Sequence, residues 1–401
     1  MKYVYKNANI IDVEKHETLE NKTISVENGL ITEIVDTYDT SDTFSCEIID
    51  LQGKYLIPGL FNCHTHMTFE VGSSQAMIVQ PGRTVQHVLI ALENLATYIK
   101  TGVTFVRDVG DYEGITVVLR DSIKQGKIKM APDVQTTARP ICMTGGSTWN
   151  LNGIQADGED ECRKTARLLI REKIDWLKLM ATGGTCTLGN KCAAEQLTVR
   201  ELQAAVEEAH KAGIKVACHA QGIEGAMNAI NAGVDCLEHG FELNDEAIEL
   251  MIQKGIWLVP TLSASYEIKK RATAETNKEF IEKANINVDN VFKSFPKAYH
   301  AGVRCAAGTD CGSILNPHSN SCEELIIMVN ELGFAPYDAL EIGTINSARL
   351  CGVDSIMGSI AAGKKANFAV YADNPGEKIV TLRNCLMTVK NGEVLYKADE
   401  F

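Results

Sequence analysis

The chain lacks the features that mark several classes of protein. Its 401 residues contain no apolar run long enough to cross a bilayer, and the N-terminus has no apolar segment followed by a small-residue cleavage site. It has no basic stripe, and a net charge of -13 disfavours nucleic acid as a partner. We therefore predict a cytoplasmic protein that binds a small molecule, with no nucleic acid and no membrane partner.

The chain also lacks a Cys-x-x-Cys pair. Its 13 cysteines are an odd number, and several lie within apolar stretches. Reduced, buried thiols explain them better than a disulfide framework does. Cys186 and Cys192, in a predicted loop, are the one pair for which a redox role stays open.

No Gly-x-Gly-x-x-Gly follows the early strands, which disfavours a doubly wound sheet. From residue 57 to 357, apolar strand segments instead alternate with helical ones, roughly seven or eight units that match an α/β fold of the (β/α)8 TIM barrel type. Strands are expected at 103–106, 133–138, 176–180, 215–218, 236–238, 257–259 and 304–307, and helices at 84–101, 160–173, 198–212, 223–231, 245–254 and 322–332.

The two ends of the chain have a different texture. Residues 1–56 and 358–401 read as short strands with turns, and Asn391-Gly392 is typical of a two-residue hairpin. Neither end is large enough to bury a core alone. We expect them to pair into one small β-sandwich domain, discontinuous in sequence, beside a barrel domain at 57–357.

Polar residues stand where the apolar strands finish. His64 and His66 are one residue apart, so on a strand both side chains point to the same face. Later strands end at Lys178, His219, His239 and Asp310. In a barrel the carboxyl ends of the strands meet at one face, so these six side chains are expected to converge.

This set of residues predicts a metal centre. Imidazole and carboxylate suit Zn²⁺. A neutral lysine amine can react with CO₂ to give a carbamate, and N6-carboxylated Lys178 would then bridge two Zn²⁺ per subunit. His64, His66 and Asp310 would hold one ion, and His219 and His239 the other. A hydroxide shared by the two ions would be the nucleophile, with Asp310 as general base and then general acid.

The same residues resemble the amidohydrolase superfamily over nearly the whole chain. The resemblance rests on the metal set, on the entry segment 57–66, on Gly308-Thr309-Asp310 and on the exit segments 344–352 and 358–367. The familiar Ala-Asp of the exit is Ala366-Asn367 here. Within the superfamily the chain looks most like the prolidase-like branch, with its zinc-dependent Xaa-Arg and Xaa-Lys carboxypeptidases and related imidazolonepropionase-type hydrolases. The motifs that carry this likeness are 101–108, 138–146, 178–184, 219–222 and 238–240.

The resemblance implies a binuclear zinc amidohydrolase that cleaves the amide bond of dipeptides or N-acyl amino acids and assembles as a homo-oligomer. It also implies that the Tyr266 phenol stabilises the oxyanion, although a tyrosine packed on the barrel rim is the alternative. Candidate substrate contacts are Arg139, Met143 with the loop that follows it, and His318, each of which also has a purely structural reading. In many relatives His-Gly follows Thr-Gly-Gly, whereas Ser147-Thr148-Trp149 follows it here, so the pocket is expected to differ.

Two other functions are weighed against this one. A cyclic-amide hydrolase of the imidazolonepropionase type would use the same metal centre. A non-catalytic scaffold with the amidohydrolase fold would be expected to have lost metal ligands, and all six are present.

Overall fold

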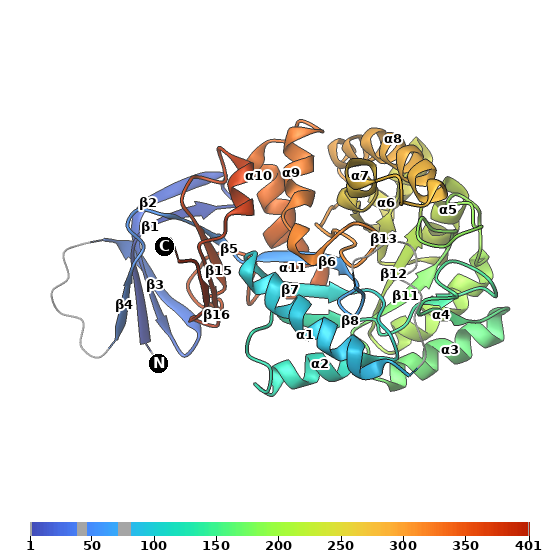
Figure 1. Cartoon of the computed structure of the whole chain (residues 1–401), viewed down its shortest axis with the longest axis horizontal. Coiled ribbons are helices and arrows are strands. Elements are labelled where there is room, and N and C mark those ends of the chain that lie inside the picture. Colours follow the sequence, from blue (N-terminus) through green and yellow to red (C-terminus); the bar gives the residue numbers. More distant parts are fainter. Residues whose placement is uncertain (1, 38–45, 71–81, 400) are drawn as a thin grey trace.

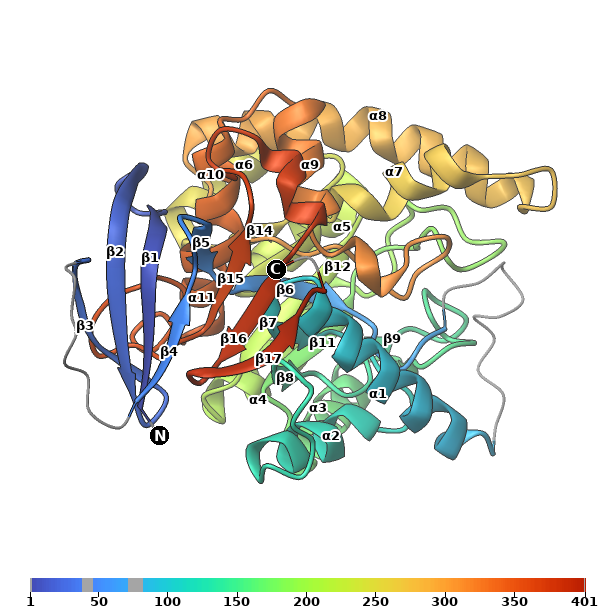
Figure 2. The ribbon, with the colours of Figure 1, turned by 60° about the vertical axis from the view of Figure 1, so that its left-hand side comes forward.

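Strands from both ends of the chain form one sheet in the computed structural model, which describes residues 2–37, 46–70, 82–399 and 401. Its order is β17-β16-β15-β5-β1-β2-β3, with β4 paired to β1 (Figures 1 and 2). N-terminal β5 pairs antiparallel with C-terminal β15, which confirms that the two ends pair. The strands are β1 Lys2–Asp12, β2 Glu17–Glu27, β3 Leu30–Asp36, β4 Glu47–Asp50, β5 Tyr55–Pro58, β15 Phe368–Tyr371, β16 Met387–Lys390 and β17 Glu393–Lys397.

Side chains from both ends fill the core of this sheet. Tyr5 and Phe368 are buried and pack edge to face, with ring centroids 4.9 Å apart. The Tyr5 hydroxyl also donates to the Gly392 carbonyl at 3.0 Å. Asn391 (φ 48°) and Gly392 (φ 78°) form the two-residue turn between β16 and β17, which confirms the predicted hairpin.

The middle of the chain places parallel strands inside a layer of helices (Figure 1). One sheet has the order β6-β7-β8 and the other β10-β9-β11-β12-β13-β14. The strands are β6 Leu60–Thr65, β7 Val103–Asp108, β8 Asp133–Thr136, β9 Ile141–Cys142, β10 Ile154–Gln155, β11 Trp176–Met180, β12 Lys215–Ala220, β13 Cys236–His239 and β14 Trp257–Val259. The helices are α1 Thr84–Lys100, α2 Ile115–Lys124, α3 Glu159–Arg171, α4 Val199–Lys211, α5 Ile223–Ala232, α6 Asp245–Lys254, α7 Leu262–Arg271, α8 Lys278–Ala301, α9 Glu323–Asn330, α10 Pro336–Glu341 and α11 Ser347–Cys351.

Backbone hydrogen bonds connect the two parallel sheets at both edges. At one edge, Asp175 donates to the Thr136 carbonyl at 2.9 Å. At the other, Cys305 bridges to β14, and Cys63 of β6 donates to the Ala307 carbonyl at 2.8 Å. The strand expected at 304–307 is therefore a series of isolated contacts. The fold is mixed α/β with parallel strands, and its closure as an eight-stranded barrel stays a prediction.

The predicted helices are present, and Thr198 caps α4 with the expected capping box. The helices α2, α7, α8, α10 and α11 were not predicted. In α8 the buried residues recur at helical spacing, from Phe280 to Ala298, but Pro296 interrupts a pattern that otherwise reads as a helix. No helix in the described part of the chain is long and apolar enough to cross a membrane.

The shared core makes the small sheet depend on both ends of the chain. Replacing Phe368 with Ala is expected to lower the free energy of unfolding by about 3–5 kcal/mol, because it removes a fully buried ring and leaves a cavity. Denaturant unfolding measures the change. Ile48→Ala on β4, where the side chain is 46% exposed, is the control and should stay within about 0.5 kcal/mol. Equal stability of the two variants would contradict the shared core.

Candidate active site

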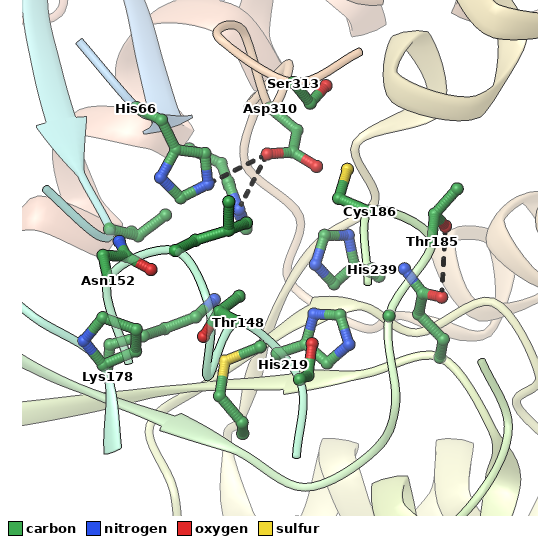
Figure 3. Close-up of a pocket in the computed structure, with 18 of the residues that line it drawn as sticks. His66, Thr148, Asn152, Lys178, Thr185, Cys186, His219, His239, Asp310 and Ser313 are labelled. Atoms are coloured by element: carbon green, nitrogen blue, oxygen red, sulfur yellow. Dashed lines mark hydrogen bonds and ion pairs between the residues drawn. The ribbon is translucent and has the colours of Figure 1, made fainter. Parts of the chain in front are cut away.

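The carboxyl ends of the parallel strands bring six polar residues to one cavity, which opens to solvent (Figure 3). The residues come from β6 and the residue that follows it, from β11, β12 and β13, and from the segment after Ala307. All six of the residues expected at strand ends therefore lie together: His64, His66, Lys178, His219, His239 and Asp310.

Asp310 lies beside the two histidines His64 and His66. Its Oδ1 is 3.0 Å from His66 Nε2 and 3.6 Å from His64 Nε2. His64, His239 and Asp310 each offer a ligand atom, and these atoms lie within 4.8 Å of one another. A single metal ion can reach donors at this spacing, so the structure contains a group able to hold a metal.

Each imidazole uses one ring nitrogen to fix its orientation. His66 Nδ1 donates to the Gly110 carbonyl and His219 Nε2 to the Gly183 carbonyl, both at 2.8 Å. His239 Nδ1 lies 2.7 Å from the Thr261 hydroxyl. This is the arrangement expected of ligand histidines, because the hydrogen bond sets the tautomer and leaves the other nitrogen with a lone pair for an ion.

His64 is held by a buried ion pair that the sequence analysis missed. Glu238 lies 2.7 Å from His64 Nδ1 and accepts from Arg107 Nη2 at 2.7 Å. Arg107 also donates to the Cys63 carbonyl at 2.6 Å, and neither charged side chain is exposed. A charged residue inside an apolar strand was the signal available in the sequence, since Arg and Glu are almost never fully buried unless they are paired.

Burial keeps most of these imidazoles neutral. It lowers the pKa of His219 to about 3 and the pKa values of His64 and His239 well below their usual range. At His66 burial also acts to lower the pKa, but the hydrogen bond and charge of Asp310 outweigh it and raise the pKa overall. Neutral imidazole is the form that binds metals.

Lys178 carries a buried amine without a partner. Its side chain is 2% exposed, and Nζ has no hydrogen-bond partner among the described residues. Burial lowers its pKa, although the charge of Glu238 opposes this. An unpaired ammonium would be costly at such a position, so the residue is suited to the neutral amine and to a modified form that makes bonds in the cavity.

The backbone at the site is strained. His239 (φ 73°) and Asp310 (φ 57°) occupy the left-handed backbone region, which residues other than glycine rarely adopt. Gly308 allows the segment after Cys305 to approach β6, because a Cβ there would lie 2.7 Å from the Cβ of His64. Such strain persists where the surrounding structure holds it, and it is common at functional sites.

The structure does not bring the other predicted site residues into the cavity wall. Tyr266 lies in α7, and its hydroxyl donates to Glu331 at 2.9 Å; its role as an oxyanion donor stays a prediction. Arg139 donates to the carbonyls of Asn152 and Gly153, which anchors a loop.

Two further candidates also have structural roles. Met143 packs against the main hydrophobic core. His318 is buried behind the site, where Tyr98 donates to its Nδ1 at 2.6 Å. The same physical reason applies to Tyr266, Arg139 and His318. In each case a side chain or carbonyl from another segment forms a hydrogen bond with the polar atom that was expected to contact the substrate.

The cavity wall also contains residues other than the predicted metal ligands, and the sequence analysis singled out only some of them. Neutral polar groups line it beside the predicted metal ligands: Thr148, Asn152, Thr185, Cys186 and Ser313, which Figure 3 labels, and also Gln221. Ser147 and Thr148 come from the loop after Met143, which was expected there. Cys186 and Cys192 are both free thiols.

The fold and this site define an enzyme that hydrolyses carbon–nitrogen bonds. The sequence model of the Amidohydrolase family matches residues 55–395, and the chain belongs to that family. It is 29% identical to ochratoxinase of Aspergillus niger over 81% of this chain and 71% of the relative. It is 24% identical to imidazolonepropionase of a Geobacillus species over 95% of this chain and 91% of the relative. Among solved structures, a Xaa-Pro dipeptidase with bound methionine in its active site is 29% identical, with a TM-score of 0.91 over 99% of this chain and 100% of that one.

Glu238 should matter for both stability and metal binding. Glu238→Gln leaves Arg107 buried with an uncompensated charge, so we expect a loss of about 3–5 kcal/mol in the free energy of unfolding. Metal affinity should fall by about 10–100-fold, because His64 loses the carboxylate that orients it. Denaturant unfolding and chelator competition measure the two effects. Glu207→Gln, which breaks an ion pair with Arg163 at the surface, is the control, and matching behaviour of the two variants would contradict the prediction.

His318 should make stability depend on pH. Burial lowers its pKa from 6.5 to about 4, so between these values the unfolded chain binds more protons and stability falls as the pH falls. Wild type should therefore lose stability relative to His318→Gln by up to about 1.4 kcal/mol per pH unit in this window. Denaturant unfolding of both proteins at pH 7.5, 6 and 5 tests this. Parallel curves would show that His318 does not titrate in this range.

Proposed function

We propose that this protein is a binuclear zinc amidohydrolase that hydrolyses the amide bond of dipeptides or N-acyl amino acids, in the manner of a dipeptidase or carboxypeptidase. The observation that carries the proposal is the buried amine of Lys178, which has no partner among the described residues and lies in a cavity lined by four oriented imidazoles. The similarity to ochratoxinase and to the Xaa-Pro dipeptidase supports an amide substrate.

In this proposal the six donors would be divided between two divalent ions. His64, His66 and Asp310 would hold one, His219 and His239 the other, and the carbamate of Lys178 would supply the anionic oxygens between them. Bound zinc acts as a Lewis acid and lowers the pKa of water, which supplies a nucleophile at neutral pH. The hydrogen bonds to Glu238, Gly110, Gly183 and Thr261 are what keep the imidazoles aimed at this position.

Asp310 is the proposed general base and acid. Its carboxylate lies against His66 and His64 and lines the cavity, so a proton taken by the carboxylate can be returned to the amine that leaves. The turn that follows Asp310 holds it in place, since Ser313 donates its backbone N–H to the Asp310 carbonyl at 3.1 Å.

The larger architecture is proposed to follow the same family. The two parallel sheets would close as one (β/α)8 barrel over 57–357, and the sheet built from 1–56 and 358–401 would form the companion β-sandwich domain. We also propose a cytoplasmic homo-oligomer.

A second candidate is hydrolysis of a cyclic amide. The similarity to imidazolonepropionase over most of both chains favours it. The same metal centre would serve both reactions, so the substrate is what separates them.

Lys178 provides the main test. Lys178→Ala should lose bound zinc and amide hydrolysis together, and short-chain carboxylates should partly restore both, because they replace the oxygens of the carbamate. Metal analysis of the purified proteins and an assay of amine release from Xaa-Pro, Xaa-Arg, Xaa-Lys and N-acyl amino acids measure the effects. Lys211→Ala, on the surface of α4, is the control.

The two parts of this proposal can fail separately. Two zinc ions per subunit in Lys178→Ala would contradict the carbamate. Two zinc ions in wild type with no amine released would move the substrate to cyclic amides.

A further inference from the structure

Three polar side chains in the cavity wall have no role in the mechanism proposed above. They are Thr148, Asn152 and Ser313, and Figure 3 shows them around the space that Asp310 and His66 face. Thr148 Oγ1, Asn152 Oδ1 and Ser313 Oγ are all buried, and none has a hydrogen-bond partner among the described residues. Buried polar atoms in folded proteins nearly always have partners, so three orphans in one cavity indicate a ligand that completes them.

Thr148 is held in place at some conformational cost. Its φ of 64° lies in the left-handed region, which a β-branched residue rarely adopts. Its carbonyl accepts from the backbone N–H groups of Leu151, Asn152 and Gly153, at 2.9, 3.2 and 3.0 Å. Arg139 fixes the far side of the same loop through two carbonyls. These hydrogen bonds give the loop a defined conformation, in which both Thr148 and Asn152 line the cavity.

Asn152 and Ser313 flank the proposed catalytic centre. A Cβ at Gly110 would lie 2.8 Å from the amide of Asn152 and 3.3 Å from the ring of His66, so the absence of a side chain at Gly110 makes room for that amide beside His66. Ser313 stands three residues after Asp310 in a tight turn. Both side chains are 3% exposed.

The cavity wall also limits the charge of what can bind. Apart from the six proposed metal-binding residues, every described residue that lines it is uncharged, and Phe69, Leu151 and Met180 are apolar. Asn152 Oδ1 only accepts hydrogen bonds and therefore requires a donor: a carboxamide N–H or a hydroxyl supplies one, whereas a carboxylate has none.

We propose that Thr148, Asn152 and Ser313 form a subsite that binds a neutral hydrogen-bonding group of the substrate, a carboxamide or a hydroxyl, beside the scissile amide. This inference rests on the proposed function and narrows its substrate class. Among the proposed substrates, the enzyme would prefer N-acyl amino-acid amides and dipeptide amides to the free acids that a dipeptidase or carboxypeptidase cleaves.

Matched substrates test this preference. The pairs are N-acetyl-leucine with N-acetyl-leucinamide, and the corresponding methionine and phenylalanine pairs, with zinc-loaded wild-type protein. We expect the kcat/KM for release of the amino-acid amide to exceed that for the free amino acid by about tenfold or more, the change expected for one buried hydrogen bond.

Substitutions then separate substrate binding from structure. Asn152→Leu and Ser313→Ala should each raise KM for the amide substrates by about tenfold and leave the free acids nearly unaffected. They should also raise Tm by about 2 °C, because each removes an unsatisfied buried polar atom. Ser265→Ala is the matched control, since Ser265 Oγ is likewise buried and unpaired but does not line the cavity. It should raise Tm without changing KM.

Each outcome decides the inference. A preference for the free acids, or variants that lower Tm and leave KM unchanged, would overturn the subsite while the proposed hydrolase stands. If no member of any pair is hydrolysed, the proposed function fails for these substrates, and calorimetry with N-acetyl-leucinamide decides the subsite. Binding to wild type that is lost in Asn152→Leu would support it, and absence of binding to wild type would overturn it.

Discussion

The buried ion pair between Arg107 and Glu238 is the interaction on which the site depends. It connects β7 to β13, and through the Cys63 carbonyl and the His64 ring it also reaches β6. Two ions removed from water lose several kcal/mol of hydration each, and only close geometry with further hydrogen bonds compensates for that loss. The ion pair therefore contributes little net stability. Its role is to position His64, which it fixes between strands that are far apart in the sequence.

Burial of the residues around this pair sets the protonation states in the cavity. Burial lowers the pKa values of three imidazoles and of Lys178, so their nitrogens keep the lone pairs that an ion or CO₂ requires. The same burial leaves several polar atoms of the described residues without partners, and Asp310 lies nearby with a φ of 57° in the left-handed region. A site of this kind reduces the stability of the empty protein, which is the usual trade between activity and stability.

The fold and the substrate are decided by different parts of the molecule. The Xaa-Pro dipeptidase shares this fold with a TM-score of 0.91 at 29% identity. The loop that carries Ser147 and Thr148 forms part of the cavity wall, outside the parallel strands. Related enzymes can therefore keep one metal centre and differ in what they recognise, because function resides in the site and not in the fold.

The sequence by itself determined most strands, many of the helices and the residues at the strand ends. Period-2 alternation and the glycine and capping signals are local, and parallel strands bring their carboxyl ends together, so the residue pattern alone assigns His64 and Asp310 to one site. Only the tertiary structure decided what each polar atom contacts. Glu238 meets Arg107 across 131 residues, and Glu331 takes the hydroxyl of Tyr266 across 65. Such contacts depend on how segments far apart in the sequence pack together, and the local sequence does not indicate this packing.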